Sequence, residues 1–198
     1  RKDEIFHSDT GLISIAGGKL TGYRIMARNV VKIVANRLEK RENRKFAKCQ
    51  TKNMRLSGGD FPFYPETNKL IEYADMKYDE AKQTGISTEH FKTLFWRYGT
   101  NIENITNKAY DKFNEIKDTE IAWLYAELWY CVNFESIETL TDFFVRRTSM
   151  IFFEIDRIPK LVDFVALTMG ELLGWDESRR KQNISEINDE IKKATVFE

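Results

Sequence analysis

The stretch "GLISIAGGKLTGYR", residues 11–24, decides how the first part of this chain folds. It joins an apolar run, two adjacent glycines and a lysine within fourteen residues. The run from Leu12 to Ala16 is typical of a buried strand, and beyond Lys19 apolar residues recur at steps of three and four. The stretch therefore predicts a strand, a glycine turn and the N-terminus of a helix.

A second short apolar segment, Ile5 to His7, precedes this run, and Asp9-Thr10-Gly11 between them is typical of a turn. The two segments predict a β-hairpin. A lone hairpin is not stable in water, so its strands require a sheet from elsewhere. The sequence opens on Arg1 rather than Met, and we expect it to be a piece of a longer protein.

The composition indicates a folded, mostly helical protein. Of 198 residues, 42% are hydrophobic and only three are proline, which leaves long stretches uninterrupted. Lys plus Arg equals Asp plus Glu at 31 each, so no global basic field favours a nucleic-acid partner. Cys49 and Cys131 form neither a metal pair nor a disulfide framework and fit a reducing cytoplasm. No run of 18 apolar residues predicts a membrane span.

Proline and glycine mark the boundaries along the rest of the chain. Residues 51–66 contain two prolines and Gly58-Gly59, which indicates a connector with a flexible turn. Capping residues beyond it predict a series of helices: 66–84 before Gly85, Ser87 or Thr88 to Tyr98, Asn101 to about 115, Asp118 to Cys131, one from Ser136 through Ile151, 157–173 before Gly174, and Asp176 to about 196. The predicted fold class is mainly α, a multi-helix domain preceded by a short strand–helix remnant of an α/β domain.

Common nucleotide and metal motifs are absent from the sequence. A P-loop ending at Gly18-Lys19 would need glycine at position 13 and Ser or Thr at position 20, where Ile13 and Leu20 stand. No Gly-x-Gly-x-x-Gly occurs, and no zinc spacing is present. His7 and His90 are interpreted as an ordinary strand residue and an exposed helix residue, so no metal site is expected.

Two further clusters are interpreted as structural. Arg146-Arg147 is expected to form ion pairs within the helices or at their surface, rather than to bind an anion. Trp123, Trp129 and Tyr130 are expected in the core rather than in a ligand cage.

The strand–glycine–helix geometry has a chemistry of its own. Gly17 and Gly18 carry no side chain and let a flat ligand approach the backbone. The first N–H groups of the helix, at Lys19, Leu20 and Thr21, would then stabilise a ligand that gains negative charge, as reduced flavin does at its N1–C2=O edge. Lys19 would add a positive charge for a substrate anion. Spacing alone favours the plainer alternative, a tight turn with Lys19 in solvent.

The longer stretch "GLISIAGGKLTGYRIMARNVV" resembles the segment that closes the flavin domain of FAD-dependent glycerol-3-phosphate dehydrogenases and the related α-glycerophosphate oxidases. The stretches "FWRYGTNIENI" and "DFFVRRTSMIFF" resemble two helices of the same family's C-terminal helical domain. The resemblance is weak between residues 40 and 90, and Ile25 stands where a basic residue is expected.

This resemblance implies a division of the chain and a set of site residues. Residues 1–50 would be the C-terminal end of the FAD-binding domain, 51–66 a linker, and 67–198 an all-α C-terminal domain. The cofactor-binding residues would be Gly17, Gly18, Lys19, Leu20 and Thr21, packed against the isoalloxazine of FAD. Lys19 and Arg1 would be the catalytic residues near the phosphate of the substrate.

The family oxidises sn-glycerol 3-phosphate to dihydroxyacetone phosphate, with hydride transfer to FAD and electrons passed to a membrane quinone or to O2. The unit that holds the FAD phosphates is missing from these 198 residues, so the resemblance implies that this fragment alone neither binds FAD nor turns over. Its implied partner is the N-terminal flavin domain of the same chain. The implied location is cytoplasmic, with peripheral association at the inner face of the cell membrane and a homodimer as open alternatives.

Two rival interpretations stay open at this point. One is a stand-alone helical interaction module whose N-terminal strands complete a partner's sheet. The other is a related flavin amine or sugar-phosphate oxidoreductase. The coding sequence upstream of Arg1 separates the first rival from the family assignment.

Overall fold

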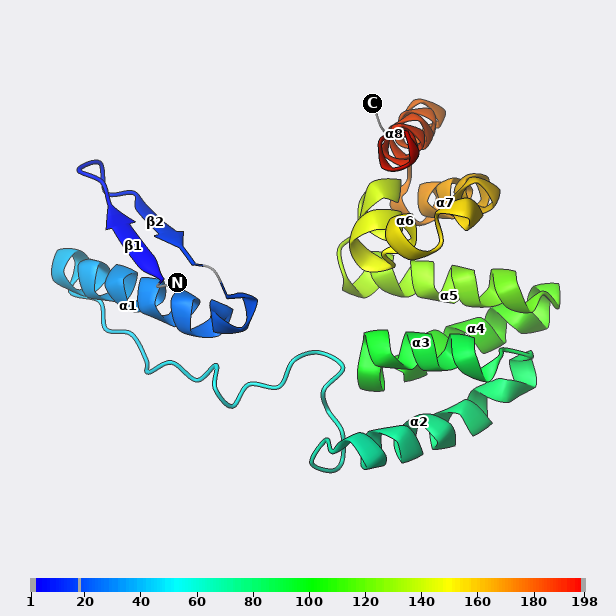
Figure 1. The fold of residues 1–198 in the computed structure, drawn as a ribbon, viewed down its shortest axis with the longest axis horizontal. Helices are drawn as coiled ribbons and strands as arrows, with labels where there is room; N and C mark the ends of the chain where they lie inside the picture. Colours follow the sequence, from blue (N-terminus) through cyan, green and yellow to red (C-terminus); the bar gives the residue numbers. More distant parts are fainter. Residues whose placement is uncertain (1–2, 18, 197–198) are drawn as a thin grey trace. The chain divides into compact units, whose positions relative to one another are not determined.

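The structure, a computed structural model, describes residues 3–17 and 19–196. It divides into two compact units, residues 1–56 and 57–198, which we call the hairpin–helix unit and the helical unit (Figure 1). Most described residues are helical, and the only sheet among them has two strands. The predicted mainly-α fold class is therefore confirmed.

The hairpin–helix unit begins with the predicted β-hairpin. Strands β1 (Glu4–His7) and β2 (Ile13–Ala16) pair antiparallel, with Ile5 opposite Ile15. The turn is closed by a hydrogen bond from Ser8 N to Leu12 O of 3.0 Å. One 3₁₀ turn, η1 (Leu20–Gly22), then leads into the long helix α1 (Tyr23–Glu42).

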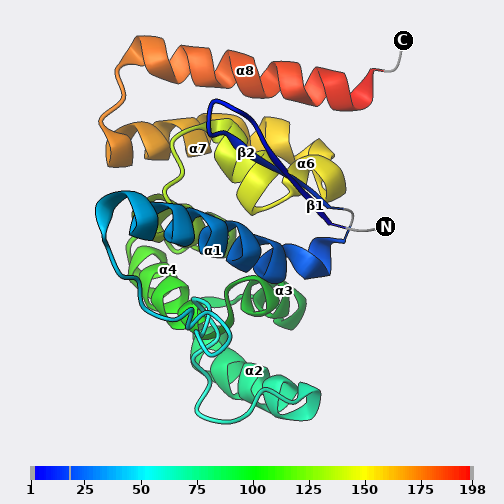
Figure 2. The same cartoon turned by 90° about the vertical axis from the view of Figure 1, so that its left-hand side faces the viewer.

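Helix α1 lies along the hairpin (Figure 1, Figure 2). Its large apolar residues that are half-buried, Met26, Val30, Ile33 and Leu38, recur at steps of three to five. Its exposed apolar residues include Tyr23, Val31 and Val34. None of the described residues in this unit is fully buried, because one hairpin and one helix offer too little surface to enclose a core.

The helical unit is a stack of helices (Figure 1). Its α-helices are α2 (Thr67–Ala81), α3 (Thr88–Tyr98), α4 (Ile102–Ile116), α5 (Thr119–Phe134), α6 (Met150–Phe153), α7 (Ile158–Leu173) and α8 (Glu177–Thr195). Short 3₁₀ turns, η2 (Lys82–Thr84), η3 (Gly99–Asn101) and η5 (Ile155–Arg157), and one π-helix, η4 (Asp142–Arg147), join them. Across residues 3–17 and 19–196, no helix combines the length and the apolar character that crossing a membrane requires.

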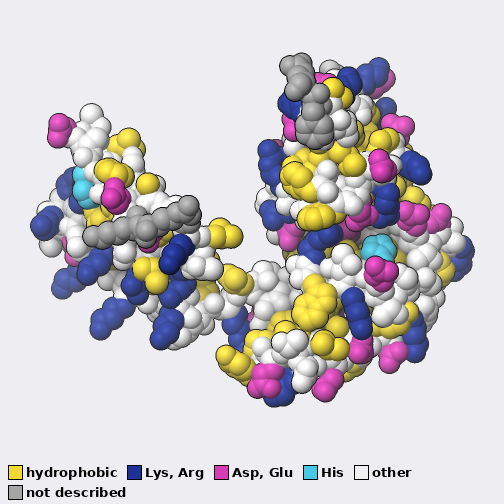
Figure 3. Space-filling model, in the orientation of Figure 1, with side chains coloured by type: hydrophobic (Ala, Val, Ile, Leu, Met, Phe, Trp, Pro, Cys, Tyr) yellow, Lys and Arg dark blue, Asp and Glu magenta, His cyan; other side chains and the backbone are white. Residues whose placement is uncertain are grey.

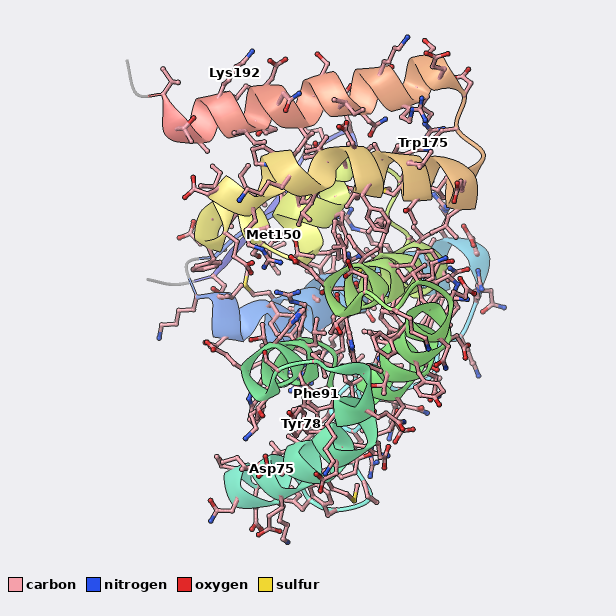
Figure 4. The ribbon with its side chains drawn as sticks, turned by 90° about the vertical axis from the view of Figure 1, so that its right-hand side faces the viewer. Asp75, Tyr78, Phe91, Met150, Trp175 and Lys192 are labelled. Atoms are coloured by element: carbon pink, nitrogen blue, oxygen red, sulfur yellow. The ribbon has the colours of Figure 1, made fainter. Side chains whose placement is uncertain are left out.

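The core of the helical unit centres on α5, which contacts both α4 and α7. Trp123 of α5 is buried against Phe91 of α3, with ring centroids 6.1 Å apart. Phe91 in turn meets Tyr78 of α2 at 5.7 Å, and Figure 4 shows these two side chains beside each other. Trp123 and Tyr130 are buried and Trp129 is half-buried against the core, which confirms their predicted structural role.

The predicted capping residues lie at the starts and ends of helices, as expected. The side chains of Ser87, Asp118 and Asp176 accept hydrogen bonds from backbone N–H groups three residues ahead, at the starts of α3, α5 and α8. Gly85 and Gly174 adopt left-handed backbone conformations at the ends of η2 and α7. These residues could be identified from the sequence because each caps the backbone groups of its own helix terminus and depends on no distant residue.

The predicted single helix from Ser136 through Ile151 is wrong. Ser136 has φ of +56°, and the helical turns begin only after Thr139. There Thr139 and Asp142 form a reciprocal cap, with Thr139 N donating to Asp142 Oδ2 and Asp142 N to Thr139 Oγ1. The following turn widens into η4, where Thr148 N donates to Phe143 O. The helix then stops at Ser149, whose φ is +58°.

Residues 57–66 pack onto the helical unit. Gly58 is buried, and its carbonyl oxygen accepts a hydrogen bond from Thr100 N of 3.0 Å. Gly99 has φ of +57°, and a Cβ atom there would lie 2.0 Å from Gly58 O. Gly58 has φ of +82°, and a Cβ atom there would lie 2.4 Å from Tyr98 O, so both positions require glycine. Phe61 adds an edge contact with Tyr73 at 5.6 Å. The Gly58-Gly59 turn is thus held by packing.

Candidate functional site

The candidate site is the segment that joins β2 to α1. Of the residues predicted to form it, Arg1 and Gly18 lie outside the described part of the chain. Lys19 is extended, with φ of −119° and ψ of 115°, and its carbonyl oxygen accepts a hydrogen bond from Gly22 N of 3.0 Å. Because this is the first acceptor of the turn, the N–H groups of Leu20 and Thr21 have no acceptor within it. They form the donor end of the η1–α1 helix.

Gly17 lies close to two side chains of its own unit. A Cβ atom at this position would lie 2.3 Å from Met26 Cε and 2.8 Å from Asp3 Oδ1. A larger residue at position 17 would therefore displace the ends of these two side chains. The sequence left two interpretations of Gly17 open, clearance for a ligand and a tight strand-to-helix turn; its close contacts with Met26 and Asp3 were not predicted.

A shallow hollow of about 690 Å³ lies beside the segment. Lys19 is its only charged residue among those described; the other lining residues are Ile15, Gly17, Leu20, Tyr23, Met26, Ala27, Val30 and Val31. Leu20 is 90% exposed and Tyr23 60% exposed, so apolar surface faces outward here. The segment thus combines an apolar wall, the backbone N–H donors at the start of η1 and one cationic side chain.

The two histidines lie in different units. His7 is on β1, as predicted, and Arg37 Nη2 lies 2.9 Å from its Nδ1. His90 was predicted to be an exposed helix residue, and this is wrong. It is half-buried and lines a pocket in the helical unit, where burial lowers its pKa. No pattern in its own helix signals this, because the other walls come from distant parts of the chain.

The predicted structural role of Arg146-Arg147 is confirmed. Arg146 Nη1 lies 2.5 Å from Asp142 Oδ1, one turn back on the same element. Arg147 Nη2 donates to the backbone oxygen of Glu135 at 2.7 Å, and its Nε lies 3.6 Å from that residue's carboxylate. Both guanidinium groups are therefore engaged within the unit.

Comparison with known proteins places this geometry in a family. A family model described as the C-terminal domain of alpha-glycerophosphate oxidase matches residues 49–180. The aerobic glycerol-3-phosphate dehydrogenase of Bacillus subtilis (strain 168) is 37% identical over 201 residues, which covers 99% of this chain and 35% of that protein. The protein of the same name from Staphylococcus haemolyticus is 36% identical, covering 98% of this chain and 34% of its own length.

A solved structure agrees with these relatives. The X-ray structure of the glycerol-3-phosphate dehydrogenase from Bacillus halodurans complexed with FAD matches with a TM-score of 0.81 and 34% identity. The match covers 98% of this chain and 38% of that one. The chain thus spans about a third of the length of its curated relatives. Since the family model covers well over half of its residues, the chain belongs to the family of the C-terminal domain of alpha-glycerophosphate oxidase.

Proposed function

We propose that this chain is the C-terminal part of an FAD-dependent glycerol-3-phosphate dehydrogenase, which oxidises sn-glycerol 3-phosphate to dihydroxyacetone phosphate. The observation that carries the proposal is the similarity to an FAD-complexed glycerol-3-phosphate dehydrogenase over 98% of the chain. In this assignment residues 1–50 complete the FAD-binding domain, 51–66 link the domains, and 67–198 form the helical domain.

The residues of the β2–α1 segment fit one wall of a flavin site. FAD, when bound, supplies the two-electron acceptor and gains negative charge as the substrate is oxidised. The N–H groups of Leu20 and Thr21 are donors suited to that charge, and the adjacent apolar hollow suits a flat ring. Gly17 and Gly18 complete the proposed set of cofactor-binding residues, together with Lys19.

Lys19 is the proposed binding residue for the substrate phosphate. Its side chain is exposed, and no ion pair involves it among the described residues. A lysine left without a carboxylate partner at the edge of an apolar hollow can supply a charge-assisted hydrogen bond to a phosphate. Arg1, which lies outside the described residues, is the second proposed substrate residue.

The whole protein would pass its electrons to a membrane quinone or to O2. A quinone acceptor places it in the cytoplasm at the inner face of the cell membrane, and a homodimer is compatible with this arrangement. Measuring sn-glycerol 3-phosphate-dependent reduction of a water-soluble quinone, against O2 consumption, separates dehydrogenase from oxidase.

The test uses the full-length protein that contains this chain. Leu20→Glu places a carboxylate at the proposed flavin wall, where it opposes the negative charge of the cofactor. Leu20 is 90% exposed, so the change costs this chain no core contact. The matched control is Leu56→Glu, which alters a leucine 72% exposed in the same unit.

The expected result is loss of the visible flavin absorbance band from purified Leu20→Glu protein, and its retention in Leu56→Glu. Full flavin content with unchanged substrate oxidation in Leu20→Glu would contradict the assignment of this wall. The isolated 198-residue chain is expected to purify without colour, and a yellow preparation would show that it binds flavin by itself.

A further inference from the structure

The balanced total charge of the chain hides two oppositely charged units. Residues 1–56 contain fourteen Lys and Arg against five Asp and Glu, whereas residues 57–198 contain seventeen against twenty-six. The formal charges are therefore +9 and −9. Residues 10–38 alone contain five basic residues and no carboxylate. The hairpin–helix unit therefore has a positive field of its own.

One face of α1 has three of these cations in a row, and we call it the basic face. Arg24, Arg28 and Lys32 follow one another at steps of four residues, so they lie along one side of the helix. Met26 and Val30, which line the hollow beside the β2–α1 segment, fall on the side opposite Arg28. Figure 3 shows Lys and Arg side chains (dark blue) on the side of this unit that lies away from the hairpin.

The cations of the basic face have no carboxylate partner. No Asp or Glu occurs between residues 20 and 36, and none of the three side chains makes an ion pair with a residue in the described part of the chain. The helical unit differs in this respect, since Lys181 and Lys193 of α8 each pair with a carboxylate three or four residues away. The basic face is thus a row of like charges whose mutual repulsion is uncompensated.

The chain that follows α1 passes near the basic face and adds to its charge. Hydrogen bonds with Thr51 lower the pKa of the Cys49 thiol, and the charges of the two arginines of the basic face lower it further, so Cys49 lies near them. Lys48 and Lys52, on either side of Cys49 in the sequence, are exposed and make no ion pair with any described residue. Two segments of the unit therefore contribute cations to one region.

An exposed apolar side chain lies within the basic face. Ile25 is 47% exposed and is one helical turn before Arg28. Apolar groups among cations suit the boundary of a bilayer, where lipid phosphates lie beside acyl chains, whereas nucleic acid offers phosphates without an adjoining apolar layer. The twenty residues of α1 form a face roughly 30 Å long, which is enough to contact several lipid headgroups.

We propose that the basic face of α1 docks on the surface of an anionic phospholipid bilayer, with Ile25 at the boundary between headgroups and acyl chains. Each Lys or Arg near such a surface adds to the attraction, which falls off within a Debye length. The apolar hollow proposed for the flavin lies on the other side of the same helix, so the two contacts do not compete. This docking rests on the proposed function, in which electrons pass to a quinone in the membrane.

The test is flotation of the full-length protein that contains this chain with two kinds of vesicle. One kind is phosphatidylglycerol mixed with phosphatidylcholine, and the other is phosphatidylcholine alone. At about 0.15 M salt the protein is expected to float with the anionic vesicles and not with the neutral ones, and about 1 M salt should release it. Flavin content and reduction of a water-soluble quinone by sn-glycerol 3-phosphate, measured on the same preparation, test the proposed function separately.

Matched variants decide whether the basic face is the docking surface. Arg28→Gln combined with Lys32→Gln is expected to weaken binding to anionic vesicles about tenfold or more, since each cation near the surface contributes. Lys181→Gln combined with Lys193→Gln makes the same charge change at exposed positions of α8 and is expected to leave vesicle binding unchanged. Ile25→Gln removes only the apolar side chain and is expected to weaken binding severalfold. Circular dichroism confirms that each variant folds.

Three results would overturn the proposal. One is the absence of any preference for anionic over neutral vesicles, and another is equal vesicle binding by the Arg28→Gln, Lys32→Gln double variant and the wild type. The third is unchanged binding by Ile25→Gln together with displacement from the vesicles by a DNA duplex, which would indicate a nucleic-acid surface. A protein that floats but contains no flavin would contradict the proposed function and support the docking surface.

Discussion

The two units differ most in what they bury. The helical unit encloses a continuous apolar core, whereas none of the described residues of the hairpin–helix unit is fully buried. Phe6, Leu20, Tyr23 and Val31 are all more than half exposed. The helical unit therefore has the contacts to hold its own fold, while the hairpin–helix unit has an apolar surface that needs a cover. This difference fits the proposed division, in which the helices form a domain of their own and residues 1–50 complete the FAD-binding domain.

Matched phenylalanine truncations give the largest expected contrast. Phe143 is fully buried, so Phe143→Ala is expected to lower the free energy of unfolding by about 3–5 kcal/mol. Phe6 is 53% exposed, and Phe6→Ala is expected to cost less than about 1 kcal/mol. All four tryptophans lie in the helical unit, so urea denaturation followed by Trp fluorescence and by circular dichroism measures both changes. Equal losses of free energy of unfolding in the two variants would contradict the difference in burial between the units.

Glycine substitutions test the same contrast at the backbone. Gly99→Ala combines a positive φ with a Cβ only 2.0 Å from Gly58 O, and is expected to cost about 2–3 kcal/mol. Gly11 has φ of +93°, but no atom lies within 4 Å of an added Cβ. Gly11→Ala is therefore expected to strain only its own turn and to leave the Trp-monitored transition unchanged. A Gly99→Ala protein as stable as wild type would contradict the close packing of residues 57–66.

Arginine substitutions test the ion pairs. Arg97→Gln leaves the nearly buried Glu127 carboxylate without its partner and is expected to cost about 2 kcal/mol. Arg37→Gln removes exposed hydrogen bonds to His7 and Gly11 and is expected to leave the Trp-monitored transition unchanged. Adding Glu127→Gln to Arg97→Gln removes the orphaned charge and should recover part of the loss. If the double variant loses more free energy of unfolding than the two single variants together, the coupling between Arg97 and Glu127 is ruled out.

The smallest expected effect is on the pH dependence of stability. Burial lowers the pKa of His90 below 6.5, so between the folded and unfolded pKa values the unfolded chain binds the additional proton. The contribution of His90 to the free energy of unfolding is then fully present above about pH 6.5, and it is lost as the pH drops toward the pKa of His90 in the folded chain. His90→Gln should flatten the fall in Tm between about pH 7 and 5. Parallel curves for the variant and the wild type would refute the buried position of His90.

Local signals predicted most of the helices, because caps such as Ser87, Asp118 and Asp176 act within one turn. The segment from Ser136 to Ile151 was mispredicted for the same reason. Its apolar spacing fits a helix, but the reciprocal cap at Thr139 and Asp142 and the left-handed Ser149 divide it. Serine rarely adopts a left-handed conformation, and no residue pattern around Ser149 predicts one.

The site divides in a similar way. The segment from Gly17 to Thr21 could be identified in the sequence because its glycines, lysine and helix N-terminus are contiguous, and its role in the whole protein stays a prediction. The pocket at His90 could not, since Glu89, Glu127 and Arg157 come from elements far apart in the chain. The opposite charges of the two units were accessible by counting each part separately; the total of zero concealed them.

The contact between Gly58 and Gly99 has a practical consequence for anyone who wishes to transplant the helical unit into another protein. A cassette that starts at Ser57 keeps the oxygen that accepts from Thr100 N and the hydroxyl that accepts from Asn101 Nδ2 at 2.8 Å. A cassette that starts at Thr67 loses both, together with the Phe61 ring that lies 6.3 Å from Phe95. The transplanted segment should therefore begin at or before Ser57, so that residues 57–66 stay attached to the helices against which they pack.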